Sequence, residues 1–232
     1  MRNLIYQYWY GVQPFYAMAS SVNIKAYADL VGADYRCDIN NPFIVGSNVE
    51  FMNCLRPIQD PAFDEYDNVL FLDMDIFATE NAQDNIFDVS VDGVGMVQEV
   101  LQPDLRQKSS SRINGVNDKI WAASVKKRFD IDVPVDHKNR PLVYNSGVVM
   151  TDRNHVLESW MLRTESAPEQ GDQEVLHNMY SPIEKLSKIY PLPHTYNTLR
   201  IDYIDNVAVK DPIVIHHTGR KGNDTIRELM NK

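Results

Sequence analysis

Residues 66–76 read YDNVLFLDMDI, a short apolar segment that ends in two carboxylates. The continuous apolar run Val69–Leu72 predicts a strand over Asn68–Asp73 that is buried on both faces, as in a parallel sheet. Ligands of open α/β sheets bind beyond the carboxyl ends of the strands. The sequence therefore predicts a functional site at the end of this strand, where Asp73 and Asp75 lie.

The spacing of Asp73 and Asp75 lets both carboxylates reach one hard cation. In an extended chain, residues i and i+2 point the same way and lie roughly 6.6–7 Å apart, and a small bend closes that gap. Oxygen ligands suit Mg²⁺ or Mn²⁺, which keep positions free for phosphate oxygens. The alternative is a structural turn, and Asp130-Ile131-Asp132 repeats the pattern elsewhere. The buried strand favours the metal, because carboxylates there are costly unless they are paired or metal-bound.

The rest of the chain alternates predicted strands and helices. The predicted strands are Leu4–Tyr8, Ala33–Cys37, Asn68–Asp73, Val94–Val97, Val143–Met150 and Ile213–His216. The predicted helices run from Pro14 to Val31 with a stop at Gly32, from Asn48 to the residue before Pro57, over Ile113–Phe129 and over Arg153–Leu162. This order predicts an α/β fold with a mainly parallel central sheet flanked by helices. No linker divides the chain, so residues 1–232 are predicted to form one domain.

Composition excludes some classes of protein. The chain has 232 residues and a formal net charge of −9, which argues against general nucleic-acid binding, since that rests on cationic phosphate contacts. No apolar run approaches the roughly 18 residues of a membrane helix, and the first ten residues lack a signal-peptide core. Cys37 and Cys54 form no disulfide framework. We therefore expect a cytoplasmic protein without a membrane span.

Two later segments place polar residues at the ends or in the middle of predicted elements. Asn145, Ser146 and Gly147 interrupt an otherwise apolar strand, and a glycine there often marks close approach of a ligand or of another backbone. Asp172 and Gln173 put a carboxylate and an amide at a predicted helix start. Both segments are candidates for contact with a substrate.

A third segment, residues 213–222, reads IVIHHTGRKG and ends a predicted strand with two histidines and two cations. A neutral imidazole can complete a metal site built on carboxylates, and either His216 or His217 fits that role. Arg220 or Lys221 can meet a leaving phosphate.

Taken together, these segments resemble the GT-A fold glycosyltransferases, and most closely the group of glycogenin and the bacterial lipopolysaccharide galactosyltransferases. Residues 66–76 resemble the Asp-x-Asp region of that group, and residues 145–147 resemble its Asn-Ala/Ser-Gly strand. Residues 172–173 resemble its Asp-Gln pair, and residues 216–221 its His-x-x-Gly-x-x-Lys motif. The four motifs occur in the family's order and span nearly the whole chain. The compact chain also resembles small stand-alone transferases encoded by large algal viruses.

The resemblance implies a single GT-A domain that moves a hexose-type sugar from a nucleotide-diphosphate sugar to a hydroxyl acceptor. The implied donor is UDP-linked, such as UDP-glucose, and the implied acceptor is a glycan, glycoprotein or glycolipid in glycan biosynthesis. The implied ion is Mn²⁺ or Mg²⁺, held by Asp73, Asp75 and His216. An inverting enzyme needs a carboxylate base at the acceptor hydroxyl, whereas the resembled group presents Asp-Gln beneath the sugar, so retention is favoured.

The resemblance also implies contacts with the substrates. The implied donor or nucleotide contacts are Gln7, Tyr8, Arg56, Asp73, Met74 and Lys221. The implied sugar or acceptor contacts are Asn145, Ser146 and Gly147, and the implied catalytic residues are Asp172 and Gln173. The sequence departs from the pattern of that group at two places. Lys221 comes one position early with no Pro-Trp after it, and Tyr8-Trp9-Tyr10 replaces the usual Thr/Asn/Asp pattern after the first strand.

Three other readings remain open. A haloacid-dehalogenase-type phosphohydrolase also ends a strand in Asp-x-Asp, with the first aspartate as nucleophile, but its motif opens the chain and some 70 residues precede it here. A non-catalytic domain that binds sugar nucleotides is the second alternative. A sugar-1-phosphate nucleotidylyltransferase shares the fold class, but its N-terminal glycine-rich motif is absent from this sequence.

Overall fold

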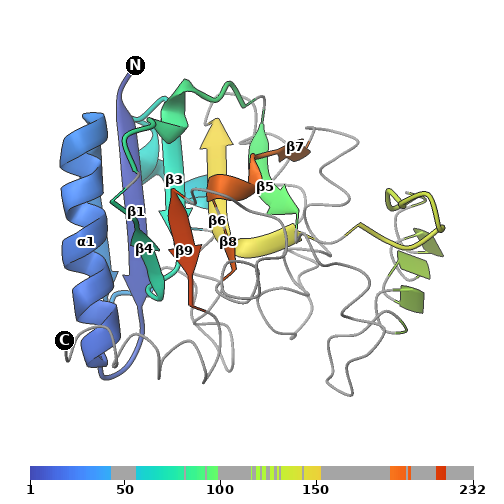
Figure 1. Ribbon diagram of the computed structural model, residues 1–232, viewed down its shortest axis with the longest axis horizontal. Helices are drawn as coiled ribbons and strands as arrows, with labels where there is room; N and C mark the ends of the chain where they lie inside the picture. The colour runs from blue at the N-terminus through green and yellow to red at the C-terminus, as the bar shows by residue number, and fades with distance from the viewer. Residues whose placement is uncertain are drawn as a thin grey trace.

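The computed structural model describes the first helix, the strands and many of the segments that connect them (Figure 1). The described residues are 1–42, 56–80, 82–91, 93–98, 116, 119–120, 122–123, 126–127, 130, 132–142, 144–152, 189–196, 198–199 and 213–217. Among them, no helix is long and apolar enough to cross a membrane.

Six strands form the main sheet, and all but one run in the same direction. In spatial order they are β2 (Asp34–Ile39), β1 (Asn3–Trp9), β3 (Asn68–Leu72), β6 (Tyr144–Asp152), β5 (Val94–Gln98) and β7 (Ile189–Pro191). β1 pairs in parallel with β2 and β3, and β5 pairs in parallel with β7. β6 runs antiparallel to both of its neighbours, β3 and β5. The predicted α/β class with a mainly parallel central sheet is confirmed.

The carboxyl ends of β2, β1 and β3 meet at one edge of this sheet. The register pairs Tyr8 of β1 with Asp38 of β2, and Tyr6 of β1 with Phe71 of β3, so Asp73 follows at the same edge. The chain goes from β1 to β2 on one side, and β3 then lies on the other side of β1. Open α/β sheets bind ligands at such a switch point, so the fold places the Asp-x-Asp segment where a ligand is expected.

A smaller sheet lies beside the main one and joins two segments that are far apart in the chain. It contains, in spatial order, β4 (Ile76–Ala78), β9 (Val214–His216) and β8 (Thr198–Leu199). β4 runs antiparallel to β9, with Ile76 opposite His216, and β8 runs parallel to β9. Figure 1 shows β4 between α1 (Phe15–Val31) and β9. Because β4 follows β3 after a short turn, this pairing brings His216 next to the end of β3.

The ends of α1 follow from its flanking residues. Pro14 is the N-cap in an extended conformation, where its fixed φ and missing N–H cost the helix nothing. Gly32 ends the helix with φ +69°, a left-handed conformation that glycine adopts without a Cβ clash. Both predicted ends of this helix are confirmed. The buried positions of α1 are Ala17, Ser20, Ile24, Tyr27 and Ala28.

The other described helices are short. They are α2 (Arg56–Gln59) and the 3₁₀ turns η2 (Pro61–Phe63), η3 (Ile86–Asp88) and η5 (His194–Tyr196). The predicted helix end before Pro57 is wrong, because α2 continues through Pro57 to Gln59; the predicted start at Asn48 lies outside the described residues. Within the predicted helix Ile113–Phe129 every described residue is helical, and Arg153–Leu162 lies outside the described residues.

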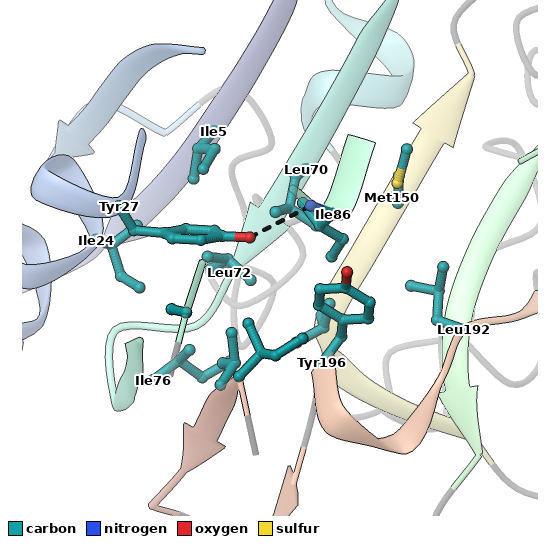
Figure 2. Close-up of a cluster of buried hydrophobic side chains, with 14 of the residues drawn as sticks. Ile5, Ile24, Tyr27, Leu70, Leu72, Ile76, Ile86, Met150, Leu192 and Tyr196 are labelled. Carbon is teal, nitrogen blue, oxygen red and sulfur yellow. Dashed lines mark hydrogen bonds between the residues drawn. The ribbon is translucent and has the colours of Figure 1, made fainter. Parts of the chain in front are cut away.

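The core lies between the main sheet and a layer made by α1 and the small sheet (Figure 2). The side chains labelled there are Ile5, Ile24, Tyr27, Leu70, Leu72, Ile76, Ile86, Met150, Leu192 and Tyr196. Tyr27 brings a hydroxyl into the core: it donates to the Asp84 carbonyl at 3.0 Å and accepts from the Ile86 N–H at 3.3 Å. This pairing lets a hydroxyl lie in an apolar layer without a lost hydrogen bond.

The opposite face of the sheet carries a second buried contact. Tyr6 of β1 packs edge-on against Phe63 of η2, with ring centroids 5.1 Å apart, and lies beside Phe71 of β3. β1 and β3 are therefore covered on both faces, which explains why their sequences are apolar without alternation.

Candidate metal centre

Asp73 and Asp75 lie in the tight turn that follows β3. The Asp73 N–H donates to the Gly147 carbonyl at 2.9 Å, and the Ile76 N–H donates to the Asp73 carbonyl at 3.3 Å. The second bond closes a β-turn over residues 73–76. This turn is the bend that the spacing of the two aspartates required.

His216 joins the two carboxylates from β9. Its Nε2 lies 3.0 Å from Asp75 Oδ1 and 3.6 Å from Asp73 Oδ2. One ligand atom from each of the three residues lies within 4.8 Å of the other two. The His216 side chain is 4% exposed, whereas those of Asp75 and Asp73 are 23% and 35% exposed. The centre is thus closed on the imidazole side and open to solvent on the carboxylate side, as a site that receives a ligand must be.

The chemistry of these three groups fits a divalent cation. Two carboxylates held this close repel each other, and a cation shared with an imidazole nitrogen removes that repulsion. Within the part of the chain that the structure describes, this is the one group of three such residues close enough to share a metal ion. The predicted combination of Asp73, Asp75 and His216 is therefore brought together in space.

His217, the alternative ligand, lies outside this group. Its ring packs edge-on against Phe77, with centroids 5.6 Å apart, and its backbone N–H donates to the Asp75 carbonyl at 3.0 Å. His217 therefore fixes the backbone of the turn, while His216 faces the carboxylates.

Two side chains of α1, which the sequence analysis did not single out, fasten β4 behind the turn. Ser20 Oγ donates to the Ile76 carbonyl at 2.7 Å. Asn23 forms a reciprocal pair with the backbone of Ala78: its Oδ1 accepts from the N–H at 2.7 Å, and its Nδ2 donates to the carbonyl at 3.1 Å. Polar residues on the inner face of an apolar helix are the signal that points to such contacts.

β6 is irregular next to the β-turn of residues 73–76, the metal turn. The register pairs Asn145 with Val97 and Val149 with Met96, so it shifts between Met96 and Val97, opposite residues 146–148. Such bulges are common beside active sites, where they redirect side chains. The predicted contact residues Asn145, Ser146 and Gly147 lie in this stretch, and the Gly147 carbonyl contacts Asp73 directly. The side chains of Asn145 and Ser146 lie outside what the structure describes.

Three residues that were predicted to contact the nucleotide-sugar donor are largely buried. Gln7 has no exposed surface, and its Nε2 donates to the Asp73 carbonyl at 3.1 Å. Tyr8 and Met74 are 9% and 4% exposed. The Gln7 side chain therefore contacts the backbone of the turn and offers no surface to a nucleotide.

Arg56 provides positive charge near the same edge of the sheet. Its guanidinium donates to Asp38 and to Asp60, both at 2.8 Å, and to the Asn41 carbonyl at 3.1 Å. Burial opposes the charge, but the hydrogen bond to Asp60 and the charge of Asp38 raise the pKa of Arg56 above its ordinary value. Asp38 lies opposite Tyr8 in the sheet, so these contacts hold the guanidinium close to the carboxyl end of β1.

The remaining predicted site residues are Asp172, Gln173, Arg220 and Lys221, and they lie outside the described residues.

Comparison with known proteins adds to this picture. No protein-family model and no curated protein matches the sequence. Among solved structures, the chain is similar to a glycosyltransferase involved in the glycosylation of the major capsid of PBCV-1, with 13% identity, full coverage of both chains and a TM-score of 0.64. The chain has a GT-A glycosyltransferase fold. The structure of mouse xyloside xylosyltransferase 1 in its apo form is also similar, at 10% identity over 93% of this chain and 97% of that one, with a TM-score of 0.48.

The predicted fold is confirmed by that similarity at the level of the whole chain. In the glycosyltransferase fold seen here, the Asp-x-Asp turn lies at the carboxyl edge of the sheet, next to β6 and β9.

Proposed function

We propose that this chain is a metal-dependent glycosyltransferase that moves a hexose-type sugar from a UDP-linked sugar donor to a hydroxyl group of an acceptor. The observation that carries the proposal is the group of Asp73, Asp75 and His216, whose ligand atoms lie within 4.8 Å of one another at the carboxyl edge of a GT-A sheet. The acceptor is a glycan, a glycoprotein or a glycolipid.

The three ligand groups fit Mn²⁺ or Mg²⁺, because carboxylate oxygens are preferred ligands of both ions. A bound ion supplies positive charge to the oxygens of the leaving diphosphate. Asp73, Asp75 and His216 hold the ion, and the two partly exposed carboxylates leave its outer side open to the donor. The chain's acidity then does not oppose an anionic donor, since the cation supplies the charge that the donor needs.

Other residues of the chain act on the donor directly in this proposal. Arg56, whose guanidinium is held near the carboxyl end of β1 by Asp38 and Asp60, approaches the donor. Gly147 leaves room for the sugar beside the metal turn, since it carries no side chain. From the motifs that they match, we assign Asp172 and Gln173 a role at the reacting carbon and Lys221 a role at the diphosphate. We propose retention of the anomeric configuration, as in the group that the motifs resemble.

The proposal is tested by calorimetric titration of UDP-sugars and GDP-sugars into the protein, with Mn²⁺ and with EDTA. We expect UDP-glucose or a related UDP-hexose to bind with Mn²⁺ and to lose most of its affinity in EDTA. Failure of every nucleotide sugar to bind contradicts the proposal. Release of phosphate from a monoester, without turnover of a sugar donor, favours the phosphohydrolase alternative instead.

A further inference from the structure

A chain of buried hydrogen bonds runs beneath the metal turn and starts from Gln7 of β1. The Gln7 side chain has no exposed surface, although it is polar and lies in the middle of the protein. Its Nε2 donates to the Asp73 carbonyl and to Ser20 Oγ, both at 3.1 Å. Its Oε1 accepts from the Tyr35 hydroxyl at 2.8 Å. Three elements, α1, β1 and β2, thus contribute to one polar network.

The groups at the ends of this network determine which partner donates in each hydrogen bond. A backbone carbonyl can only accept, so the Gln7 group that faces Asp73 is the NH₂ and the other is the carbonyl oxygen. Burial raises the pKa of Tyr35, so its hydroxyl keeps its proton and donates to Gln7. Ser20 accepts from Gln7 and donates to the Ile76 carbonyl at 2.7 Å. The amide cannot rotate by 180° without losing these contacts.

The network contacts the turn at both of its ends. Asp73 is the first metal-ligand residue and Ile76 is the first residue of β4, and their carbonyls accept from Gln7 and Ser20. Further contacts of the turn come from Gly147, which accepts from the Asp73 N–H, and from His217, which donates to the Asp75 carbonyl. The backbone that carries the two carboxylates is therefore held from below by the Gln7 network and from the sides by β6 and β9.

We propose that Gln7 is a positioning residue for the metal centre, and that Gln7, Ser20 and Tyr35 together hold the turn in the conformation in which its two carboxylates can share one cation. This inference rests on the proposed function. Without a cation the carboxylates repel each other, so the turn needs support that does not come from the metal. Partners that orient metal ligands typically change metal affinity by about 10–100-fold when they are removed.

The test measures Mn²⁺ affinity from the electron paramagnetic resonance signal of the free ion, together with the melting temperature. Gln7→Met keeps the length of the side chain and removes the amide. We expect it to weaken Mn²⁺ binding by about tenfold or more at a temperature where the variant is folded. With a UDP-sugar donor, kcat falls at saturating acceptor while KM for the acceptor stays near the wild-type value.

Thr151→Val is the matched control. Thr151 is buried on β6, and its hydroxyl donates to the Val69 carbonyl at 3.1 Å, at the other end of β3. This variant also removes a buried hydrogen bond from a side chain to the backbone of β3. We expect it to lower the melting temperature while Mn²⁺ affinity stays unchanged.

A folded Gln7→Met protein that binds Mn²⁺ as tightly as the wild type overturns the inference and leaves the proposed function standing. If Gln7→Met does not fold, Tyr35→Phe decides in the same way, because it removes only the hydroxyl that orients the amide: weaker Mn²⁺ binding supports the inference, and unchanged binding overturns it. A wild-type protein that binds no Mn²⁺ contradicts the proposed function itself, and the inference with it.

Discussion

Asp75 contributes a carboxylate that lies at hydrogen-bonding distance from His216, and its own backbone carbonyl is held by His217. Its position is thus fixed twice, once through the side chain and once through the backbone. Asp73 is fixed through its N–H by Gly147 and through its carbonyl by Gln7. Hydrogen bonds to the backbone of both residues therefore hold the turn without using the carboxyl groups.

The first prediction concerns Asp75→Asn. Replacing one carboxylate by an amide removes a charged ligand, so we expect Mn²⁺ affinity to fall by at least about 100-fold, beyond the range for partners that only orient ligands. The melting temperature without metal should stay equal or rise, because the repulsion between Asp73 and Asp75 is relieved. Titration with Mn²⁺ and a thermal melt check the two parts.

The chain provides a control for this variant in the second Asp-x-Asp tripeptide. Asp132 is exposed and pairs with Lys126 at 2.9 Å. Asp132→Asn should leave Mn²⁺ affinity as it is in the wild type. An equal loss of affinity in both variants would mean that the ion binds acidic surface in general and has no specific site at Asp75.

At this scale, the ligands could be predicted from sequence and the support beneath them could not. Asp73 and Asp75 follow a recognisable strand, and His216 ends another. Gln7 belongs to a strand as well, but nothing in the sequence tells whether its amide faces a ligand or a carbonyl of the protein. That choice depends on Ser20 and Tyr35, which reach Gln7 only after α1 and β2 have packed on β1.

Among the elements, β4 is the one that links the metal turn to the rest of the fold. It has only three residues, Ile76–Ala78, and it lies between β9 on one side and the polar side chains of α1 on the other. Isolated strands of this length have no stability of their own. β4 therefore depends on contacts from both sides, and the position of the turn depends on β4.

The second prediction concerns Asn23→Leu. The change removes both hydrogen bonds to the Ala78 backbone and leaves its N–H and carbonyl with fewer partners at a half-buried site. We expect a loss of about 1–3 kcal/mol in the free energy of unfolding, measured by urea denaturation. Ser21→Ala is the control, because the Ser21 hydroxyl donates to the Met18 carbonyl of its own helix and hydrogen-bonds to Tyr35, and neither partner belongs to β4. Equal stability of the Asn23 variant and the control would contradict the role assigned to Asn23.

The third prediction concerns the end of α1. Gly32 has φ +69°, and a Cβ added there would meet no atom within 4 Å, so a substitution is penalised by the backbone conformation alone. We expect Gly32→Ala to lower the free energy of unfolding by about 1–2 kcal/mol. Gly32→Asn should cost less, because asparagine tolerates the left-handed region. A Gly32→Ala protein as stable as the wild type would contradict this explanation of the helix end.

The predicted strands with long apolar runs are all present, whereas β4, β7 and β8 were not predicted. Those three strands have two or three residues each, too few for a periodicity to be read. Their existence depends on pairing with β5 or β9, which is decided by the tertiary structure. α2 also departs from the prediction, since Arg56 is helical although the residue before a proline usually avoids the helical region.

At the scale of the whole molecule, the main sheet and its core hold the metal turn in place. β3 lies at the centre of this arrangement: Leu70 and Leu72 point into the core, Tyr6 and Phe71 lie on the opposite face, and Asp73 follows the strand directly. Stability of the core and geometry of the site are therefore properties of the same strand. The net charge of −9 adds repulsion that a bound cation reduces.

The fourth prediction concerns Leu70→Ala. Leu70 is fully buried in the core, so we expect a loss of about 2–5 kcal/mol in the free energy of unfolding, with the midpoint of urea denaturation lowered accordingly. Leu30→Ala is the control, because Leu30 lies on α1 and is 56% exposed, and its effect should stay within about 0.5 kcal/mol. A Leu70 variant no less stable than the Leu30 variant would contradict the position of the core.

The central claim is that Asp73, Asp75 and His216 hold a divalent cation that serves transfer from a nucleotide sugar. The most direct measurement is the release of UDP from a panel of UDP-hexoses, with an acceptor or with water, in Mn²⁺ and in EDTA. We predict release in Mn²⁺ by the wild type, little release in EDTA, and little release by a folded His216→Ala protein under either condition. Equal release with and without the metal, or by the wild type and the His216 variant, would contradict the claim.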